Sequence, residues 1–183
     1  MSIDAKQAQQ TLHEADCLYT HTQVQAALDK MAHAITDKLQ GKNPLVLCVM
    51  TGGIIPAGHL LTRLSMPLQI DYIHATRYRG ETTGSHLHWL VRPTHALRGR
   101  DVLIIDDIYD EGITLSEIAE YCWAQGAADV SIAVLINKIH NHKQPLQVDF
   151  VGLETPDRYL FGYGMDYKDY LRNAPGIYAV KGM

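Results

Sequence analysis

The sequence is poor in cysteine and carries no excess of basic residues. Its 183 residues include only three cysteines, Cys17, Cys48 and Cys122, and no two of them form a C-x-x-C pair. Isolated cysteines in odd number argue against a disulfide framework or a zinc ribbon and suit reduced thiols of the cytosol. Sixteen Lys and Arg against twenty Asp and Glu give a formal net charge of -4, so the basic footprint of a nucleic-acid-binding protein is missing.

Long hydrophobic runs are also missing. The apolar runs reach only the length of a buried strand, far short of the ~20 residues that a membrane-spanning helix needs. The first ten residues, MSIDAKQAQQ, lack the charged-then-apolar pattern of a signal peptide. We therefore expect a cytoplasmic protein that binds neither nucleic acid nor membranes.

The hydrophobic content of the sequence suffices for one folded domain over residues 1–183. Hydrophobic residues make up 46% of the chain and charged residues 20%, which allows a sizeable core. Residues 1–42 form an N-terminal helical portion in this prediction. Its main helix spans 22–40 and ends before Gly41, because apolar residues recur at three- and four-residue steps. A weaker helix is predicted over 5–16.

After Pro44 the pattern changes to short apolar runs that alternate with helical segments. This alternation predicts an α/β fold with a mainly parallel sheet flanked by helices. The connection 75–86 is polar and contains glycine, and 87–91 resembles a short edge strand. Helices are predicted over 55–64 and 114–125, and strands of a single mixed sheet over 45–50, 68–74, 87–91, 102–105, 130–136, 148–153 and 177–180.

Three carboxylates after one buried strand give the strongest chemical signal. Asp106, Asp107 and Asp110 follow the apolar run VLII and precede Gly112 and a helix, at the strand edge where open α/β sheets bind ligands. Backbone N–H groups at the start of that helix can bind a phosphate. The two adjacent carboxylates can accept hydrogen bonds from vicinal sugar hydroxyls or hold Mg²⁺ through water. A phosphorylated sugar is the predicted ligand; the plainer alternative is that these aspartates only cap the helix and solvate the strand end.

Two other patterns are weaker. The Gly53 to Gly58 segment has the glycine spacing of a P-loop, but His59 and Leu60 stand where Lys and Ser or Thr are needed. The pairs His86-x-His88 and His140-x-His142 could each present two imidazoles on one face of a strand, yet no third ligand is evident. We therefore predict neither a P-loop nor a histidine metal site, and we interpret these histidines as surface residues.

The segment VLIIDDIYDEGITL resembles the phosphoribosyl-pyrophosphate (PRPP) binding motif of type I phosphoribosyltransferases. VLINK ending at Lys138, the 148–167 segment and DYKDYLR ending at Arg172 resemble the hypoxanthine-guanine branch of that family. The resemblance covers most of the chain from about Leu45. It implies a type I phosphoribosyltransferase fold, with a small base-binding hood to which the C-terminal segment contributes, and a homodimer or homotetramer.

The implied activity is purine salvage, in which hypoxanthine or guanine plus PRPP gives IMP or GMP plus pyrophosphate, with Mg²⁺ as cofactor. Asp110 would be the catalytic group, as the proton acceptor near N7 of the purine. Lys138 would donate to the 6-oxo group, Tyr159 would stack on the base, and Leu160 would offer main-chain groups. Asp166 would read the base or hold Mg²⁺, and a loop beginning at Arg77 would close over the site. The residues implied for PRPP are Thr51, Gly52, Asp106, Asp107, Asp110, Glu111, Gly112, Ile113, Thr114 and Arg172, and those implied for the metal are Asp106, Asp107 and Asp166.

Two positions depart from the family pattern. Glu111 stands where the family commonly has Thr or Ser, and a carboxylate beside a phosphate would repel it, so we expect this side chain to point outward. Thr51 replaces a frequent Lys of the pyrophosphate loop, which leaves more of the leaving-group charge to Mg²⁺ and Arg172. A xanthine-preferring relative and a PRPP-sensing regulatory protein without turnover remain alternatives. Asp110, Lys138 and Arg172 argue against the regulatory protein.

Overall fold

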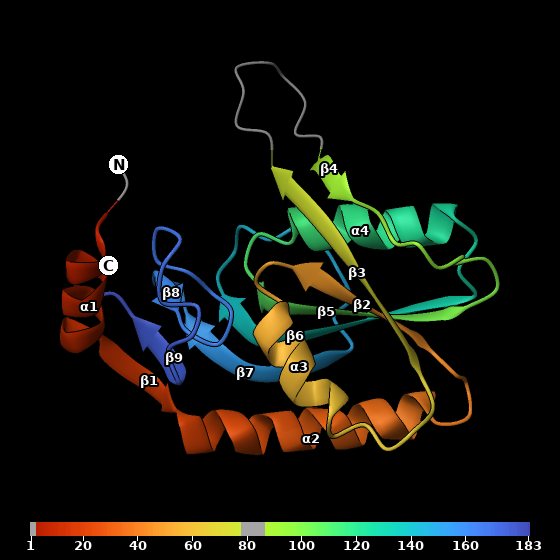
Figure 1. Cartoon of the computed structure of the whole chain (residues 1–183), viewed down its shortest axis with the longest axis horizontal. Helices are drawn as coiled ribbons and strands as arrows, with labels where there is room; N and C mark the ends of the chain where they lie inside the picture. The colour runs from red at the N-terminus through yellow and green to blue at the C-terminus, as the bar shows by residue number, and fades with distance from the viewer. Residues whose placement is uncertain (1–2, 78–86) are drawn as a thin grey trace.

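The computed structural model describes residues 3–77 and 87–183, which form two sheets and the helices that pack on them (Figure 1). The larger sheet has six strands and the smaller has three. The helices are α1 (Ala5–Glu14), α2 (His21–Leu39), α3 (Ile54–Leu61) and α4 (Ile113–Ala124). The strands are β1 (Asp16–Thr20), β2 (Leu45–Met50), β3 (Gln69–Arg77), β4 (Leu87–Val91), β5 (Asp101–Tyr109), β6 (Asp129–Ile139), β7 (Phe150–Pro156), β8 (Leu160–Phe161) and β9 (Gly176–Ala179).

The six-stranded sheet has the order β4-β3-β2-β5-β6-β7. All neighbouring strands in it run parallel except β4, which pairs antiparallel with β3 at the edge. The mainly parallel sheet and the β4 edge strand confirm the predicted fold class. After β2 the chain adds β3 on one side, and β5 then lies on the other side of β2. This reversal opens a crevice at the carboxyl ends of β2 and β5, where ligands of such sheets bind.

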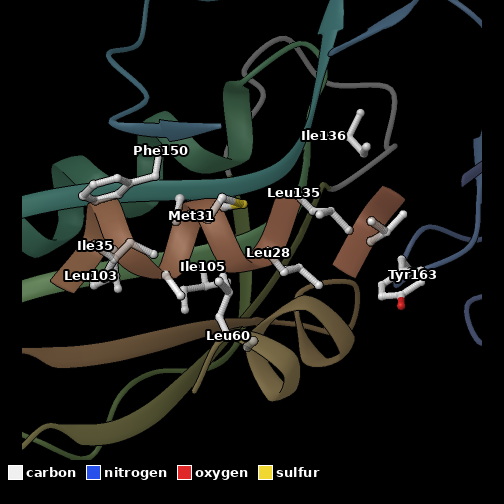
Figure 2. Packing of buried hydrophobic residues seen from close by; sticks show 14 of the residues in the cluster. Leu28, Met31, Ile35, Leu60, Leu103, Ile105, Leu135, Ile136, Phe150 and Tyr163 are labelled. Atoms are coloured by element: carbon white, nitrogen blue, oxygen red, sulfur yellow. The ribbon is translucent and has the colours of Figure 1, made fainter. Parts of the chain in front are cut away.

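Helices cover both faces of this sheet, because alternate side chains of the central strands point to opposite sides. Leu103 and Ile105 of β5 pack in a cluster with α2 and α3, whereas Val102 and Ile104 pack in a second cluster with α4. Figure 2 shows Ile35 of α2 beside Leu103 and Ile105 in the first cluster. The absence of polar alternation in β5 thus follows from burial on both faces.

The three-stranded antiparallel sheet, β1-β9-β8, corrects the prediction of a single sheet. The predicted strand 177–180 exists as β9 but pairs with β1 and β8 instead of joining the main sheet. β1 interrupts the N-terminal portion that was predicted as helical. Its five residues, DCLYT, are exposed or half-buried, so no apolar run marks it in the sequence.

Most other elements agree with the prediction to within a few residues, but β5 and β6 are longer than expected. β5 continues through Asp106 and Asp107 to Tyr109, because its pairing with β6 persists to Tyr109 and Asn137. The predicted connection 75–86 begins in β3, and residues 78–86 lie outside the described residues. In the described part of the chain, none of the helices is both long and apolar enough to cross a bilayer.

Candidate active site

A cavity of about 450 Å³ opens at the carboxyl edge of the main sheet. Most of the site residues predicted from the sequence line it, although they come from five separate segments of the chain. These lining residues are Gly52, Asp106, Asp107, Asp110, Glu111, Gly112, Thr114, Lys138, Tyr159, Leu160, Asp166 and Arg172. Thr51 and Ile113 are outside the lining. Thr51 is exposed beside it and follows a cis peptide bond after Met50.

Asp106 and Asp107 form a buried acidic pair in the C-terminal half of β5. The Asp107 backbone N–H donates to Oδ1 of Asp106 at 2.9 Å. Burial raises the pKa of Asp106 well above its ordinary value, and the neighbouring Asp107 charge adds to the effect. Burial likewise raises the pKa of Asp107, against the opposing charge of Arg172. Hydroxyl donors or a cation at this pair would therefore stabilise the ionised carboxylates.

The turn between β5 and α4 has the form of an anion site. Gly112 has a φ of +81°, and a Cβ there would lie 2.4 Å from the Tyr109 ring, so the turn requires glycine. Among the described residues no side chain caps α4 at Gly112, which leaves its first N–H groups and the helix dipole for a ligand. Thr114, a residue with a hydroxyl group, also lines the cavity. Glu111 is exposed at the cavity rim, and the outward direction of its carboxylate stays a prediction.

Asp110 lies at the centre of a charged cluster. Lys138 donates from Nζ to Oδ2 of Asp110 at 3.0 Å and lies 3.2 Å from Oδ1 of Asp157. His140 Nε2 lies 2.8 Å from the other oxygen of Asp110, Oδ1. Partial burial opposes ionisation of Asp110, but the hydrogen bonds from Lys138 and His140 outweigh it and lower the pKa of this carboxyl.

His140 corrects the interpretation of the histidine pairs as surface residues. Its side chain is only 8% exposed, whereas His142 and His88 are exposed and His86 lies outside the described residues. Asp110, His140 and Asp157 offer possible metal-ligand atoms within 4.8 Å of one another. The Lys138 ammonium already lies against both carboxylates, so we interpret the cluster as an ion-pair network.

A second group of residues approaches from the segment between β8 and β9, which we call the hood (162–175). Asp166 pairs with Arg172 at 2.7 Å, and Arg172 also donates from Nη1 to the Gly164 carbonyl at 2.6 Å. A Cβ at Gly164 would lie 2.1 Å from the carbonyl oxygen of Gly52, and a Cβ at Gly52 would lie 2.1 Å from Oδ2 of Asp107. The hood, the β2–α3 loop and the end of β5 are therefore in direct contact at these glycines.

Tyr163 fixes the hood to the helices, a role that the sequence did not reveal. It is buried at 3% exposure with a φ of +48°. Its hydroxyl lies 2.7 Å from Nδ1 of His21 and accepts a hydrogen bond from Gln25. Arg63, which follows α3, donates to the same Gln25 and pairs with Asp29 of α2. Tyr159, which lines the cavity, differs from Tyr163 in being 41% exposed.

Comparison with known proteins gives a consistent result. A family model described as phosphoribosyl transferase domain matches residues 14–169. The hypoxanthine-guanine phosphoribosyltransferase of Bacillus subtilis is 30% identical over 165 residues, which cover 90% of this chain and 92% of that protein. The hypoxanthine-guanine-xanthine phosphoribosyltransferase of Tritrichomonas foetus is 29% identical over 165 residues, with 90% of each chain covered.

Two solved structures extend the similarity to three dimensions. A hypoxanthine phosphoribosyltransferase from Staphylococcus aureus has a TM-score of 0.87 and 27% identity, and the match covers 92% of this chain and 93% of that one. The hypoxanthine phosphoribosyltransferase of Trypanosoma cruzi in complex with the product IMP has a TM-score of 0.85 and 27% identity, over 92% of this chain and 96% of that one. The residues that the family model matches include every cavity-lining residue except Arg172.

Proposed function

Since this chain belongs to the phosphoribosyltransferase family, we propose that it converts hypoxanthine or guanine and PRPP to IMP or GMP and pyrophosphate. The observation that carries this proposal is the convergence, on one cavity, of an uncapped helix N-terminus, a buried acidic pair, a lysine and an exposed aromatic ring. Each feature matches a different part of the two substrates.

The sugar phosphate fits the part of the cavity formed by β5 and α4. The 5′-phosphate of PRPP binds at the N–H groups of Gly112 to Thr114, where the helix dipole favours an anion. The ribose hydroxyls donate to Asp106 and Asp107, whose buried carboxylates need such donors. Arg172, which pairs with Asp166, supplies a cation for the pyrophosphate group.

The purine binds between β6 and the hood. Its ring stacks on Tyr159, and its 6-oxo group accepts from Lys138. When Lys138 turns to the base, Asp110 loses one of the donors that lower its pKa and becomes a better proton acceptor. The reaction breaks the bond between the anomeric carbon and a pyrophosphate oxygen and forms a bond to a purine nitrogen, while Asp110 takes the proton that the imidazole ring of the purine releases. The transition state has oxocarbenium character, as in glycoside hydrolysis.

The donor set of the cavity fits Mg²⁺. Asp106 and Asp107 would hold the ion through carboxylate oxygens, which are the ligands that Mg²⁺ prefers alongside substrate phosphates and water. Asp166, which pairs with Arg172 in this structure, would add an oxygen once Arg172 turns to the pyrophosphate. The raised pKa values of Asp106 and Asp107 mark a position where a cation is stabilising. A bound Mg²⁺ would neutralise charge on the departing pyrophosphate.

Two further properties belong to this proposal. A homodimer or homotetramer would cover the exposed apolar side chains of Ile54, Ile70 and Tyr72. Light scattering coupled to gel filtration measures the mass of the oligomer directly. Free thiols at Cys17, Cys48 and Cys122 support a reducing compartment such as the cytoplasm.

A single assay tests the activity. The purified protein is incubated with PRPP, Mg²⁺ and hypoxanthine, guanine, xanthine or adenine, and nucleotide formation is followed by chromatography. We expect IMP and GMP and only a trace of AMP. Xanthosine monophosphate as the main product would favour the xanthine-preferring alternative, and PRPP binding without any nucleotide would favour the regulatory protein.

A further inference from the structure

We propose that His140 is a positioning residue for Asp110, and that it holds Oδ1 of this carboxylate so that Oδ2 faces the purine site. The inference rests on the proposed function, in which Asp110 accepts a proton from the base. It concerns a residue that the resemblance to the family does not assign.

The position of His140 follows from the length of β6. Lys138 is in β6, and His140 comes directly after its last residue, Ile139. Residues two apart in an extended chain point to the same side. Lys138 and His140 therefore reach the same carboxylate, one at each oxygen, at 3.0 and 2.8 Å.

A backbone contact fixes the tautomer of the His140 ring. The backbone N–H of His142 donates to Nδ1 of His140 at 3.1 Å. An N–H group can only donate, so Nδ1 is the accepting, unprotonated nitrogen. The ring proton is then on Nε2, which donates to Asp110. His140 thus supplies a directed hydrogen bond from a neutral ring, and its burial keeps competing water away from that bond.

Asp110 needs such a partner because its contact with Lys138 is shared with a second carboxylate. Its side chain is 42% exposed in the turn between β5 and α4. Lys138 divides its contact between Asp110 and Asp157, and in the proposed reaction it turns to the 6-oxo group. His140 has no such second task and can retain Oδ1 throughout turnover.

The pH dependence of kcat/KM reflects every charged or titratable group that faces Asp110. Lys138 and His140 face it from the β6 end, and Lys143 acts on it from the following loop through its charge. Glu111 is its neighbour in the turn, and Asp157 opposes it across Lys138. Among these groups, only the His140 ring is changed in the experiment below.

The experiment compares His140→Phe, which removes the donor, with His140→Gln, whose amide can donate in its place. Asn141→Ala, at an exposed position in the same loop, controls for loop perturbation. We expect His140→Phe to lower kcat with hypoxanthine by about 10- to 100-fold, since a misplacement of about 1 Å has effects of this size, while the KM for PRPP stays unchanged. The acid limb of the profile of kcat/KM for hypoxanthine moves to higher pH in His140→Phe, because the carboxylate has lost a donor, and it stays in place in His140→Gln and Asn141→Ala.

A wild-type kcat and pH profile in His140→Phe would overturn the inference. A loss of kcat in His140→Gln as large as that in His140→Phe would also overturn it. Nitrogen NMR of the imidazole in the unaltered protein gives a readout that does not need activity. It should find Nδ1 unprotonated and Nε2 protonated, and the opposite tautomer would also overturn the inference. If the unaltered protein forms no nucleotide while NMR finds the expected tautomer, the proposed function fails and the His140–Asp110 contact is retained.

Discussion

Replacement of Gly164 by alanine should separate the hood from the β2–α3 loop. The new Cβ would lie 2.1 Å from the Gly52 carbonyl oxygen, whereas an ordinary contact is about 3.5 Å, so the two segments must move apart by more than about 1 Å. The atom that it meets belongs to the backbone and cannot rotate away. Gly164 also has a φ of +112°, which alanine rarely adopts.

Overpacking costs about 1–3 kcal/mol, and an incompatible φ costs about 1 kcal/mol more. We expect Gly164→Ala to lower the free energy of unfolding by roughly 2–4 kcal/mol, which leaves a typical domain folded. A displacement of this size at the site should reduce kcat by about 100-fold. Urea unfolding and steady-state kinetics measure the two effects.

Gly58→Ala is the matched control. Gly58 is in α3, and a Cβ there would meet nothing within 4 Å, so alanine should stabilise the helix by about 0.5–1 kcal/mol. The same substitution should therefore lower the free energy of unfolding at Gly164 and raise it at Gly58. Normal stability and kcat in Gly164→Ala would refute the contact between the hood and the β2–α3 loop.

Four other variants test separate parts of the account. Asp110→Asn should lower kcat by about 10²- to 10⁴-fold with an unchanged Kd for PRPP by calorimetry; wild-type turnover would remove Asp110 from the mechanism. The unaltered protein should prefer hypoxanthine to adenine by about 10⁴-fold, and Lys138→Gln should weaken this preference, because its amide both donates and accepts; equal use of both bases before substitution would contradict the role of Lys138. Glu111→Thr should leave the Kd for PRPP unchanged or lower it, and loss of binding would mean that Glu111 makes an essential contact. Ile35→Ala should lower the free energy of unfolding by about 2–5 kcal/mol without changing KM values, since Ile35 packs under the sheet (Figure 2) and not at the cavity.

Local patterns account for the elements that the sequence predicted best. The observed bounds of β2 and β4, Leu45–Met50 and Leu87–Val91, are the predicted ones, because apolar composition and turn residues mark both ends of these strands. The acidic pair was predicted for the same reason, since a buried strand that ends in carboxylates is visible in a short window. The edge of the parallel sheet then brings these residues together with Lys138.

Features that depend on distant pairing were missed. β1 gains its strand conformation from β9, with Asp16 opposite Ala179, and its own residues carry no apolar pattern. The role of His140 was missed because the predicted strand ended at Ile136. Once β6 extends to Ile139, the two-residue spacing from Lys138 places His140 on the side of Asp110. The hydrogen bonds of Tyr163 join the hood to His21 and Gln25 of α2, more than 130 residues earlier in the chain, and no local pattern could indicate them.

The most direct test of the central claim is a crystal structure of the protein with IMP. In this complex the phosphate should lie against the N–H groups of residues 112–114, and the ribose hydroxyls should face Asp106 and Asp107. The hypoxanthine ring should stack on Tyr159, with its 6-oxo oxygen within hydrogen-bond distance of Lys138 Nζ. A nucleotide bound in the reverse direction, or outside this cavity, would contradict the account.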